Sequence, residues 1–366
     1  MKNKNKLIIL LVILLIVIIV LVIALMPKTN SETLTIGAIL PLTGGASVWG
    51  ESIKNGMEIA QQELSQEGIN IKFIYEDSKA DSKEAISAYQ SLKLKDVDVV
   101  VSAFSRVSIP IISLVDNDKI PLIMTIVAAK GVADESPYAF RFYVDEKAYA
   151  DSHFNNINIG DYNTMGLLYI NDEYGVSVSD HIKKRAEEKQ IDIVAEENFN
   201  PGTTEFKTQL SKIKSKNPEM IMFVSSTPIE GINIVEEFNE LQIDADLYES
   251  SSVLSAESTR KQASADGVYT SAALFLMQDS EFKNNYKETY NKDPSLGADF
   301  GYDIIRLVAK ATNGQKLNGE AIAQNIINLK TFDSLNGKVD IQSNGEINPV
   351  MYSVKIVNGE LELYNQ

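Results

Sequence analysis

The sequence predicts an α/β protein built from two units and preceded by one membrane-spanning helix. At 366 residues the chain exceeds one ordinary domain. Strands rich in Val and Ile alternate with helical patterns twice along the chain, which is typical of parallel sheets covered on both faces. Residues 7–26 are all apolar and as a helix would span roughly 30 Å, the thickness of a bilayer core.

The first element is the apolar segment 7–26, which follows three lysines. The positive-inside bias leaves the N-terminus in the cytoplasm and exports the rest. A cleaved signal peptide and a retained anchor are both conceivable. The segment is longer than the ~7–15 residues of a signal h-region and lacks a small-residue cleavage site. We therefore favour a retained single-pass anchor in the cytoplasmic membrane, with residues 1–32 forming the cytoplasmic stub, the anchor and a linker.

The first α/β unit begins directly after this linker. Its strands are continuous apolar runs, as expected for strands buried on both faces, and a helical pattern follows each of the first two. We expect strands at 34–40, 71–76, 97–104 and 120–126, with helical patterns at 51–64 and 82–92.

The second unit repeats this rhythm and ends differently. We expect strands at 164–170, 191–198, 218–226 and 265–272, with an amphipathic helix at 178–189. The last stretch, 337–364, holds two Asn-Gly turn signals between alternating segments. Asn-Gly favours tight hairpins, so an antiparallel tail is expected to close one sheet.

Composition excludes several classes of function. The chain has no cysteine, so disulfides, thiolate nucleophiles and cysteine metal sites are ruled out. A net charge of −16 disfavours nucleic acid as a partner. No phosphate-binding loop or dinucleotide fingerprint opens a helix, and the two histidines, His153 and His181, are expected on solvated helix surfaces. We predict no enzyme, no metal and no cofactor.

The loops after the expected strands carry distinctive residues. In open parallel sheets, ligands bind at the carboxyl ends of the strands. There the chain places small hydroxyl residues, glycines and single aromatics, which suit the polar and apolar parts of a small molecule. These loops read LPLTGGASVWG, AFSRVS, TIVAAKG, NDEYG, SSTPIEG and ESSSV.

The order of these segments, followed by GYDIIRLVAKA, resembles the leucine/isoleucine/valine-binding protein family, the type I solute-binding proteins of ABC importers. The resemblance covers residues 33–366. It implies two doubly wound parallel-sheet lobes, joined by a three-crossover hinge, with the ligand between them. Lobe I would comprise 33–145 and 273–340, and lobe II 146–272 and 341–366. An ABC permease in the membrane would be the partner.

The resemblance also assigns site residues. Trp49 matches an aromatic wall in the first loop, Ser105 a hydrogen-bonding position for a ligand carboxylate, and Tyr174 an aromatic contact from the second lobe. Thr227 and Ser250 fall at second-lobe contact positions by spacing alone. Each of the first three has a structural alternative: a tryptophan packed on its own lobe, a helix N-cap, and a tyrosine packed across the hinge.

Departures from the family pattern bear on the ligand. Ile126 and Ala128 occupy the stretch where amino-acid-binding members offer a backbone carbonyl and then a hydroxyl. Ser250 stands where many members carry an acid for the ligand ammonium, although Glu249 is adjacent. Arg106 is either a solvated cation or a partner for an anionic ligand. The pattern favours a ligand with an acidic or amide head and no free ammonium.

Together these features predict an extracytoplasmic solute-binding protein of an ABC importer, which binds a small amino-acid-like, amide or carboxylate ligand by hinge closure. Two rivals remain. One is a membrane-tethered sensor of the same fold that signals through a partner protein. The other is an enzyme on a doubly wound fold, which the missing catalytic motifs disfavour.

Overall fold

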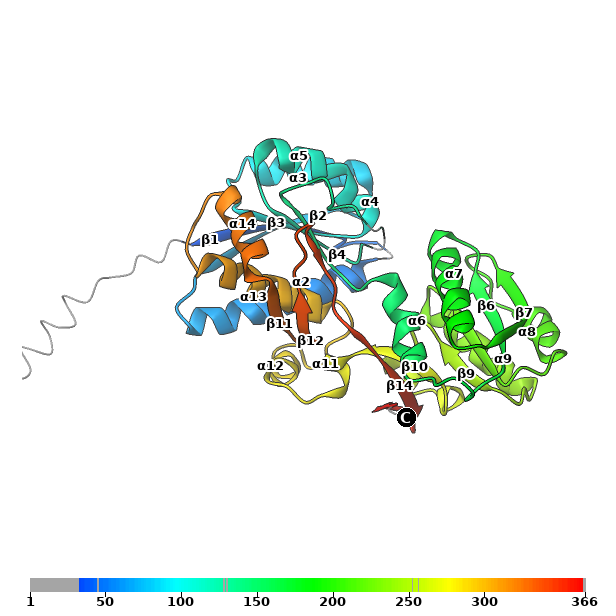
Figure 1. Ribbon diagram of the computed structural model, residues 1–366. Coiled ribbons are helices and arrows are strands. Elements are labelled where there is room, and N and C mark those ends of the chain that lie inside the picture. The colour runs from blue at the N-terminus through cyan, green and yellow to red at the C-terminus, as the bar shows by residue number, and fades with distance from the viewer. Residues whose placement is uncertain are drawn as a thin grey trace, which may run out of the picture. The chain divides into compact units, whose positions relative to one another are not determined.

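The structure, a computed structural model, describes residues 33–44, 46–127, 129, 131–251, 253–255 and 257–364. Two large sheets carry this part of the chain, and helices flank both (Figure 1). The predicted membrane helix 7–26 lies outside the described residues. Among the helices that are described, none is long and apolar enough to cross a membrane.

The first sheet has six parallel strands in the order β13-β5-β4-β3-β1-β2. Its strands are β1 (Leu34–Leu40), β2 (Ile71–Asp77), β3 (Val99–Ala103), β4 (Leu122–Thr125), β5 (Ala139–Phe142) and β13 (Glu346–Ile347). The strand order reverses between β1 and β3. The loops that leave this switch point open the crevice in which such sheets bind ligands.

The second sheet repeats this parallel arrangement and adds an antiparallel edge, in the order β15-β14-β10-β9-β8-β6-β7. Its strands are β6 (Thr164–Ile170), β7 (Asp192–Phe199), β8 (Met220–Val224), β9 (Asp246–Glu249), β10 (Tyr269–Ala273), β14 (Met351–Val357) and β15 (Glu360–Leu363). The expected antiparallel tail is confirmed. Asn358 and Gly359 both have positive φ in the turn between β14 and β15.

The chain passes between the two sheets three times. It leaves the first sheet after β5, returns after β10, and leaves again between β13 and β14. The lobe boundaries stay a prediction, and the pairing of one strand bears on them. β13 pairs with β5 in the first sheet, although residues 341–366 were assigned to lobe II.

Helices cover both faces of each sheet, and most follow a strand directly. They are α2 (Ser47–Gln66), α3 (Ser82–Lys93), α4 (Ser105–Ser108), α5 (Ile112–Asp118), α6 (Glu146–Phe154), α7 (Glu173–Glu188), α8 (Lys207–Lys214), α9 (Pro228–Glu240), α10 (Glu257–Arg260), α11 (Leu274–Met277), α12 (Glu281–Tyr290), α13 (Ala298–Thr312) and α14 (Gly319–Leu329). Short 3₁₀ turns lie at 109–111, 253–255 and 263–265, and β11 (Thr331–Ser334) and β12 (Gly337–Asp340) form a separate hairpin.

Apolar residues on both faces of β1 explain why its run is continuous. Ile36 and Ala38 belong to the core that α2 and α13 cover, whereas Ile39 belongs to the core on the α3 side. The second sheet is buried in the same way, with Phe223 of β8 in one core and Met222 in the other. Strands buried on both faces need no alternation of polar and apolar residues.

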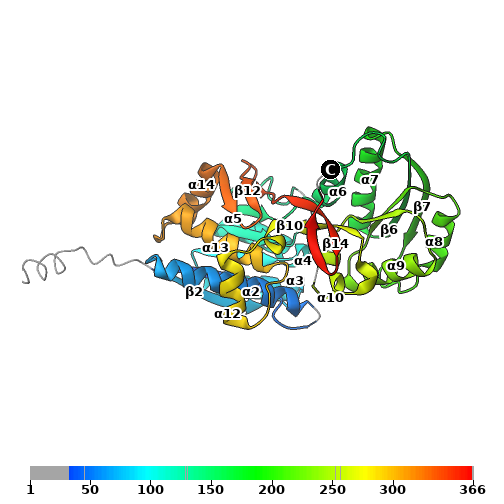
Figure 2. The same ribbon diagram turned by 90° about the horizontal axis from the view of Figure 1, so that it is seen from below.

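The packing of α2 on α13 depends on two glycines. A Cβ on Gly56 would lie 1.9 Å from the carbonyl oxygen of Ala298, and a Cβ on Gly301 would lie 2.1 Å from that of Ile53. Only glycine permits this approach of the two backbones. Both views show the two helices side by side, with α12 next to α2 (Figures 1 and 2). This contact fixes α2, whose first turn carries Trp49.

The histidines lie elsewhere than expected. His153 is fully buried, so the prediction of a solvated surface histidine was wrong for this residue. Its Nδ1 lies 2.7 Å from the Ser353 hydroxyl and its Nε2 lies 2.7 Å from the Glu249 carbonyl oxygen. Burial lowers the pKa of His153 to about 4, so the ring is neutral and ties α6 to β9 and β14. His181 is mostly buried as well and meets Asp151 at 2.7 Å.

Candidate functional site

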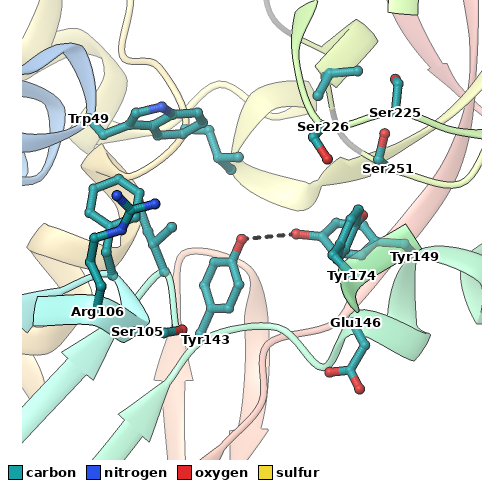
Figure 3. A pocket seen from close by; sticks show the side chains of 14 residues that line it. Trp49, Ser105, Arg106, Tyr143, Glu146, Tyr149, Tyr174, Ser225, Ser226 and Ser251 are labelled. Carbon is teal, nitrogen blue, oxygen red and sulfur yellow. Dashed lines mark hydrogen bonds between the residues drawn. The ribbon is translucent and has the colours of Figure 1, made fainter. Parts of the chain in front are cut away.

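A cavity of about 370 Å³, here called the inner cavity, collects residues from the carboxyl ends of strands in both sheets. Its lining is rich in aromatic rings and hydroxyl groups (Figure 3). The lining residues are Trp49, Phe104, Ser105, Arg106, Ile126, Tyr143, Glu146, Tyr149, Tyr174, Ser225, Ser226, Ser251, Val253 and Leu296.

Five residues predicted from the sequence line this cavity: Trp49, Ser105, Arg106, Ile126 and Tyr174. Four come from the loops and helix starts that follow β1, β3 and β4, and Tyr174 comes from the first turn of α7. Figure 3 shows Trp49 and Arg106 on one side of the cavity, opposite the side chains from the second sheet. The structure thus brings together residues that are 125 positions apart, from Trp49 to Tyr174.

Three predicted residues remain. Ala128 lies outside the described residues, and the other two are placed differently from the prediction. Thr227 is the N-cap of α9, and Ser250 is fully buried with a hydroxyl that has no hydrogen-bond partner among the described residues. Their neighbours Ser226 and Ser251 line the cavity instead. One residue of displacement along a strand end turns a side chain to the other face.

Sequence reasoning missed Tyr143, Glu146 and Tyr149, which all follow β5. The hydroxyls of Tyr143 and Tyr149 lie 3.2 Å apart, and the ring of Tyr149 meets that of Tyr174 edge to face with centroids 6.5 Å apart. The signal was available, because the loop after β5 lies at the same sheet edge as the other loops. The strand itself was not recognised, since Arg141 interrupts its apolar run.

Two lining residues have strained backbones. Phe104, directly before α4, has φ 74° and ψ 140°, and Ile126, directly after β4, has φ 51°. Positive φ is costly for bulky and β-branched residues, roughly 1–3 kcal/mol each, and such residues cluster at ligand sites. Both outliers lie where the chain turns from a strand into the cavity wall. Both turns are therefore candidates for a functional role.

Opposite charges line the inner cavity. Arg106 is exposed, whereas Glu146 is buried to 8% exposure at the start of α6. Burial raises the pKa of Tyr143 and Tyr174, so both hydroxyls stay protonated at neutral pH. The cavity therefore offers one basic side chain, one acidic side chain and several hydroxyls.

Glu249 is fully buried behind two of the cavity serines. Its Oε1 accepts hydrogen bonds from Ser251 Oγ at 2.6 Å and from Ser225 Oγ at 3.4 Å. Its Oε2 accepts from Thr270 Oγ1 at 2.6 Å and from the Leu254 amide at 3.0 Å. Burial raises the pKa of Glu249 to about 7 in spite of these donors.

This arrangement orients the serine hydroxyls. A hydroxyl has one proton, and Ser225 and Ser251 both donate theirs to the ionised form of Glu249. Only their lone pairs remain for the cavity. The side of the cavity nearest Glu249 therefore accepts hydrogen bonds, although the carboxylate itself does not line it.

The chain is similar to known proteins in sequence and in fold. The chain is 22% identical over 355 residues to the Leu/Ile/Val-binding protein BraC3 of Rhizobium johnstonii, which covers 91% of this chain and 93% of that protein. The substrate-binding protein LivJ of Streptococcus pneumoniae, solved with isoleucine, has a TM-score of 0.75 at 23% identity and covers 92% of this chain and 100% of that one. A solute-binding protein of Rhodopseudomonas palustris, solved with 3,4-dihydroxybenzoic acid, has a TM-score of 0.74 at 21% identity, covering 91% and 96%.

The structural likenesses show the fold, which is the type I periplasmic binding protein fold with two parallel-sheet units. The family assignment rests on the sequence. The family model described as periplasmic binding protein matches residues 33–360, nearly all of the described chain. The chain belongs to the periplasmic binding protein family.

Proposed function

We propose that this chain is the extracytoplasmic solute-binding component of an ABC importer and that its ligand lies in the inner cavity. The observation that carries this proposal is the composition of the cavity wall. Aromatic and hydroxyl residues converge on it from the carboxyl ends of strands in both sheets. The names of relatives such as BraC3 point to the same role.

The mechanism that we propose is closure about the three crossovers. A ligand that contacts Ser105 and Arg106 from one sheet and Ser226 and Ser251 from the other is better bound when the two units approach. Such differential contact shifts the population towards the closed form. The closed form would then dock on a permease in the membrane.

The ligand that we propose is amino-acid-like, with a carboxylate or amide oxygen at Ser105 and Arg106. Isoleucine and 3,4-dihydroxybenzoic acid, which occupy two related proteins, share a carboxylate. The sequence disfavoured a free ammonium because Ser250 replaces an acid. In the structure, Glu249 acts on the cavity through Ser225 and Ser251, whose lone pairs suit an N–H donor.

Calorimetry with leucine and with its deaminated keto-acid tests this assignment. Leucine should bind more tightly, by roughly 10- to 100-fold, because the keto-acid offers no N–H donor to the serines. Arg106→Ala should weaken both ligands, since both carry the carboxylate. Equal or tighter binding of the keto-acid would contradict the donor assignment but would leave the solute-binding role intact.

Glu249→Gln provides the sharper comparison, because it keeps the shape of the side chain. The Gln amide donates to Ser225 and Ser251, so their protons turn towards the cavity. The preference for leucine over the keto-acid should then shrink or reverse. Glu187→Gln, a matched change at an exposed residue outside the cavity, should leave the preference unchanged.

We further propose that residues 7–26 stay attached and anchor the protein in the cytoplasmic membrane, with the ligand-binding units outside. The support is the length of the apolar segment and the absence of a cleavage site. Mass spectrometry of the native protein should find the intact N-terminus. A mature N-terminus near Lys28 or Ser31 would contradict the anchor.

The alternative function is a membrane-tethered sensor of the same fold. A gene for a signalling kinase beside this one, in place of permease and ATPase genes, would favour a tethered sensor.

A further inference from the structure

A second cavity of about 400 Å³ adjoins the inner cavity and is here called the outer cavity. Trp49, Val253 and Leu296 line both, so these three side chains form the boundary between the two cavities. The complete lining of the outer cavity is Val48, Trp49, Pro228, Val253, Glu257, Ser258, Arg260, Leu276, Asp293, Pro294, Ser295 and Leu296.

The outer cavity draws on helix starts and loops of both units. Val48 and Trp49 lie in the first turn of α2, Pro228 is the first residue of α9, and Leu276 lies on α11. Val48 is 68% exposed. An aliphatic side chain with that exposure in a cavity lining is available to a ligand.

Most of the lining is apolar, and several polar groups in it already have partners. Glu257 pairs with Lys261, and Asp293 lies 3.2 Å from Lys287. The Ser295 hydroxyl lies 2.9 Å from that of Ser52. Arg260, the cation in this lining, has an interaction partner as well. An apolar occupant of this cavity therefore gains by burying hydrocarbon against Val48, Leu276 and Leu296.

We propose that the outer cavity is a subsite for the apolar tail of the ligand whose polar head occupies the inner cavity. This inference rests on the proposed function, and it names the ligand class more narrowly. The ligand is an amphipathic amino-acid-like molecule with an unbranched or aryl tail longer than the side chain of leucine. Trp49 covers the head with one part of its ring system and the tail with another.

The volumes agree with a ligand of this length. Small-molecule sites enclose about 300–1,000 Å³, and each cavity alone lies near the lower end of this range. A ligand that passed between these shared side chains would fill a combined volume well inside this range. A ligand as short as leucine would leave the outer cavity unused.

The test is a homologous series of 2-amino acids from 2-aminobutyrate through norvaline and norleucine to 2-aminooctanoate. Affinity for the full-length protein in detergent should rise about fourfold with each added methylene, and it should keep rising through 2-aminooctanoate. Val48→Asp places a carboxylate in the outer cavity alone. It should weaken 2-aminooctanoate about tenfold or more and leave 2-aminobutyrate unchanged.

The controls separate this subsite from the function on which it rests. Detergent micelles also take up apolar tails. The decisive quantity is therefore the ratio of the affinities of wild type and variant for one ligand, measured in the same detergent. Ile86→Asp is a matched change at an exposed residue outside both cavities, and it should alter no affinity. Short members that bind while longer ones gain nothing would overturn the subsite alone, as would equal weakening of every member by Val48→Asp. Binding of no member would overturn both proposals.

Discussion

Trp49 is the only tryptophan of the chain, and it lies where the inner and outer cavities meet. Replacing it with Ala removes an aromatic wall but keeps the polar contacts. We therefore expect Trp49→Ala to weaken leucine binding by roughly 1–3 kcal/mol, measured by calorimetry. In the wild type, the single tryptophan fluorescence should change when ligand binds. Unchanged affinity in a variant with a normal unfolding midpoint would place Trp49 outside the site.

Glu249 should make stability depend on pH. Its folded pKa of about 7 lies above its ordinary value of 4.5, so the folded state holds the proton more tightly than the unfolded state. For an acid whose pKa is raised by folding, the contribution of that acid to the free energy of unfolding is largest below its unfolded pKa. This contribution declines as the pH rises towards 7, and it no longer changes at higher pH. Between pH 5 and pH 8 the decline is on the order of 2–3 kcal/mol.

Glu249→Gln should abolish this part of the pH dependence. The free energy of unfolding of both proteins would be measured by urea titration at pH 5 and at pH 8. We expect the wild type to lose more stability than the variant between these two pH values. The same slope in both proteins would mean that Glu249 is ionised at pH 5 already. Asp299, whose pKa is also raised by burial to about 6, stays in both proteins and cancels.

The sequence could indicate some site residues and not others, and the difference lies in what positions each residue in the cavity. Trp49, Ser105 and Tyr174 lie in the first turns of the helices that follow strand ends, where the rule for parallel sheets applies without knowledge of side-chain direction. Thr227 and Ser250 could not be told from Ser226 and Ser251, because one residue of register decides which side chain faces the cavity. The role of Glu249 required the position of its four donors, which come from the segments after β8 and β9 and from β10.

The start of α9 offers a matched pair of variants. Thr227 Oγ1 accepts a hydrogen bond from the Glu230 amide at 3.3 Å, and Glu230 Oε2 accepts from the Thr227 amide at 3.1 Å. This capping box occupies the Thr227 hydroxyl. Thr227→Ala should therefore lower the free energy of unfolding by about 1 kcal/mol and leave leucine affinity unchanged.

Ser226→Ala should do the opposite, since Ser226 lines the inner cavity and does not cap the helix. Leucine affinity should fall while the urea midpoint stays in place. Reduced affinity in Thr227→Ala with normal stability would return the contact to Thr227, as its spacing in the sequence suggested.

Strands with uninterrupted apolar runs were predictable, and β6 begins and ends at the expected residues 164 and 170. β5 was not, because Arg141 sits in the middle of its four residues. Arg141 is only 1% exposed and survives burial through Glu346, which is 205 positions away in the sequence. A local pattern cannot show a partner at that distance, so the tyrosines and Glu146 that follow β5 were missed with it.

The paired sheets repeat one strand order, and three crossovers join them. Alternating strands and helices predicted two α/β units, but they are compatible with two sequential domains as well as with interleaved ones. Only the resemblance to a known family indicated that the chain returns to the first sheet. The strand β13 has only two residues, so it shows no alternation of polar and apolar residues in the sequence. Its position beside β5 is known only from the pairing of the two strands in the structure.

Arg141 connects these crossovers to the inner cavity. Its guanidinium lies 2.6 Å from Glu346 Oε2, donates to the Val127 carbonyl at 3.0 Å and donates to Asn348 Oδ1 at 3.3 Å. Glu346 lies in β13, Asn348 lies in the crossover that follows it, and Val127 follows the strained cavity residue Ile126. One buried cation thus contacts both the last crossover and a cavity loop.

Glu346→Gln should lower the free energy of unfolding on the order of 3 kcal/mol, measured by urea titration, because it leaves Arg141 buried without its anion. The double variant Arg141→Met with Glu346→Leu should recover most of that stability, since apolar residues of similar volume can replace a buried ion pair.

Leucine affinity should not recover with stability in the double variant. The Val127 carbonyl has lost its donor, so nothing holds Ile126 at positive φ, and the cavity wall relaxes to a cheaper conformation. If affinity returned together with stability, Arg141 would be a structural ion pair alone, and the strain at Ile126 would have to be held by contacts on its own side of the sheet.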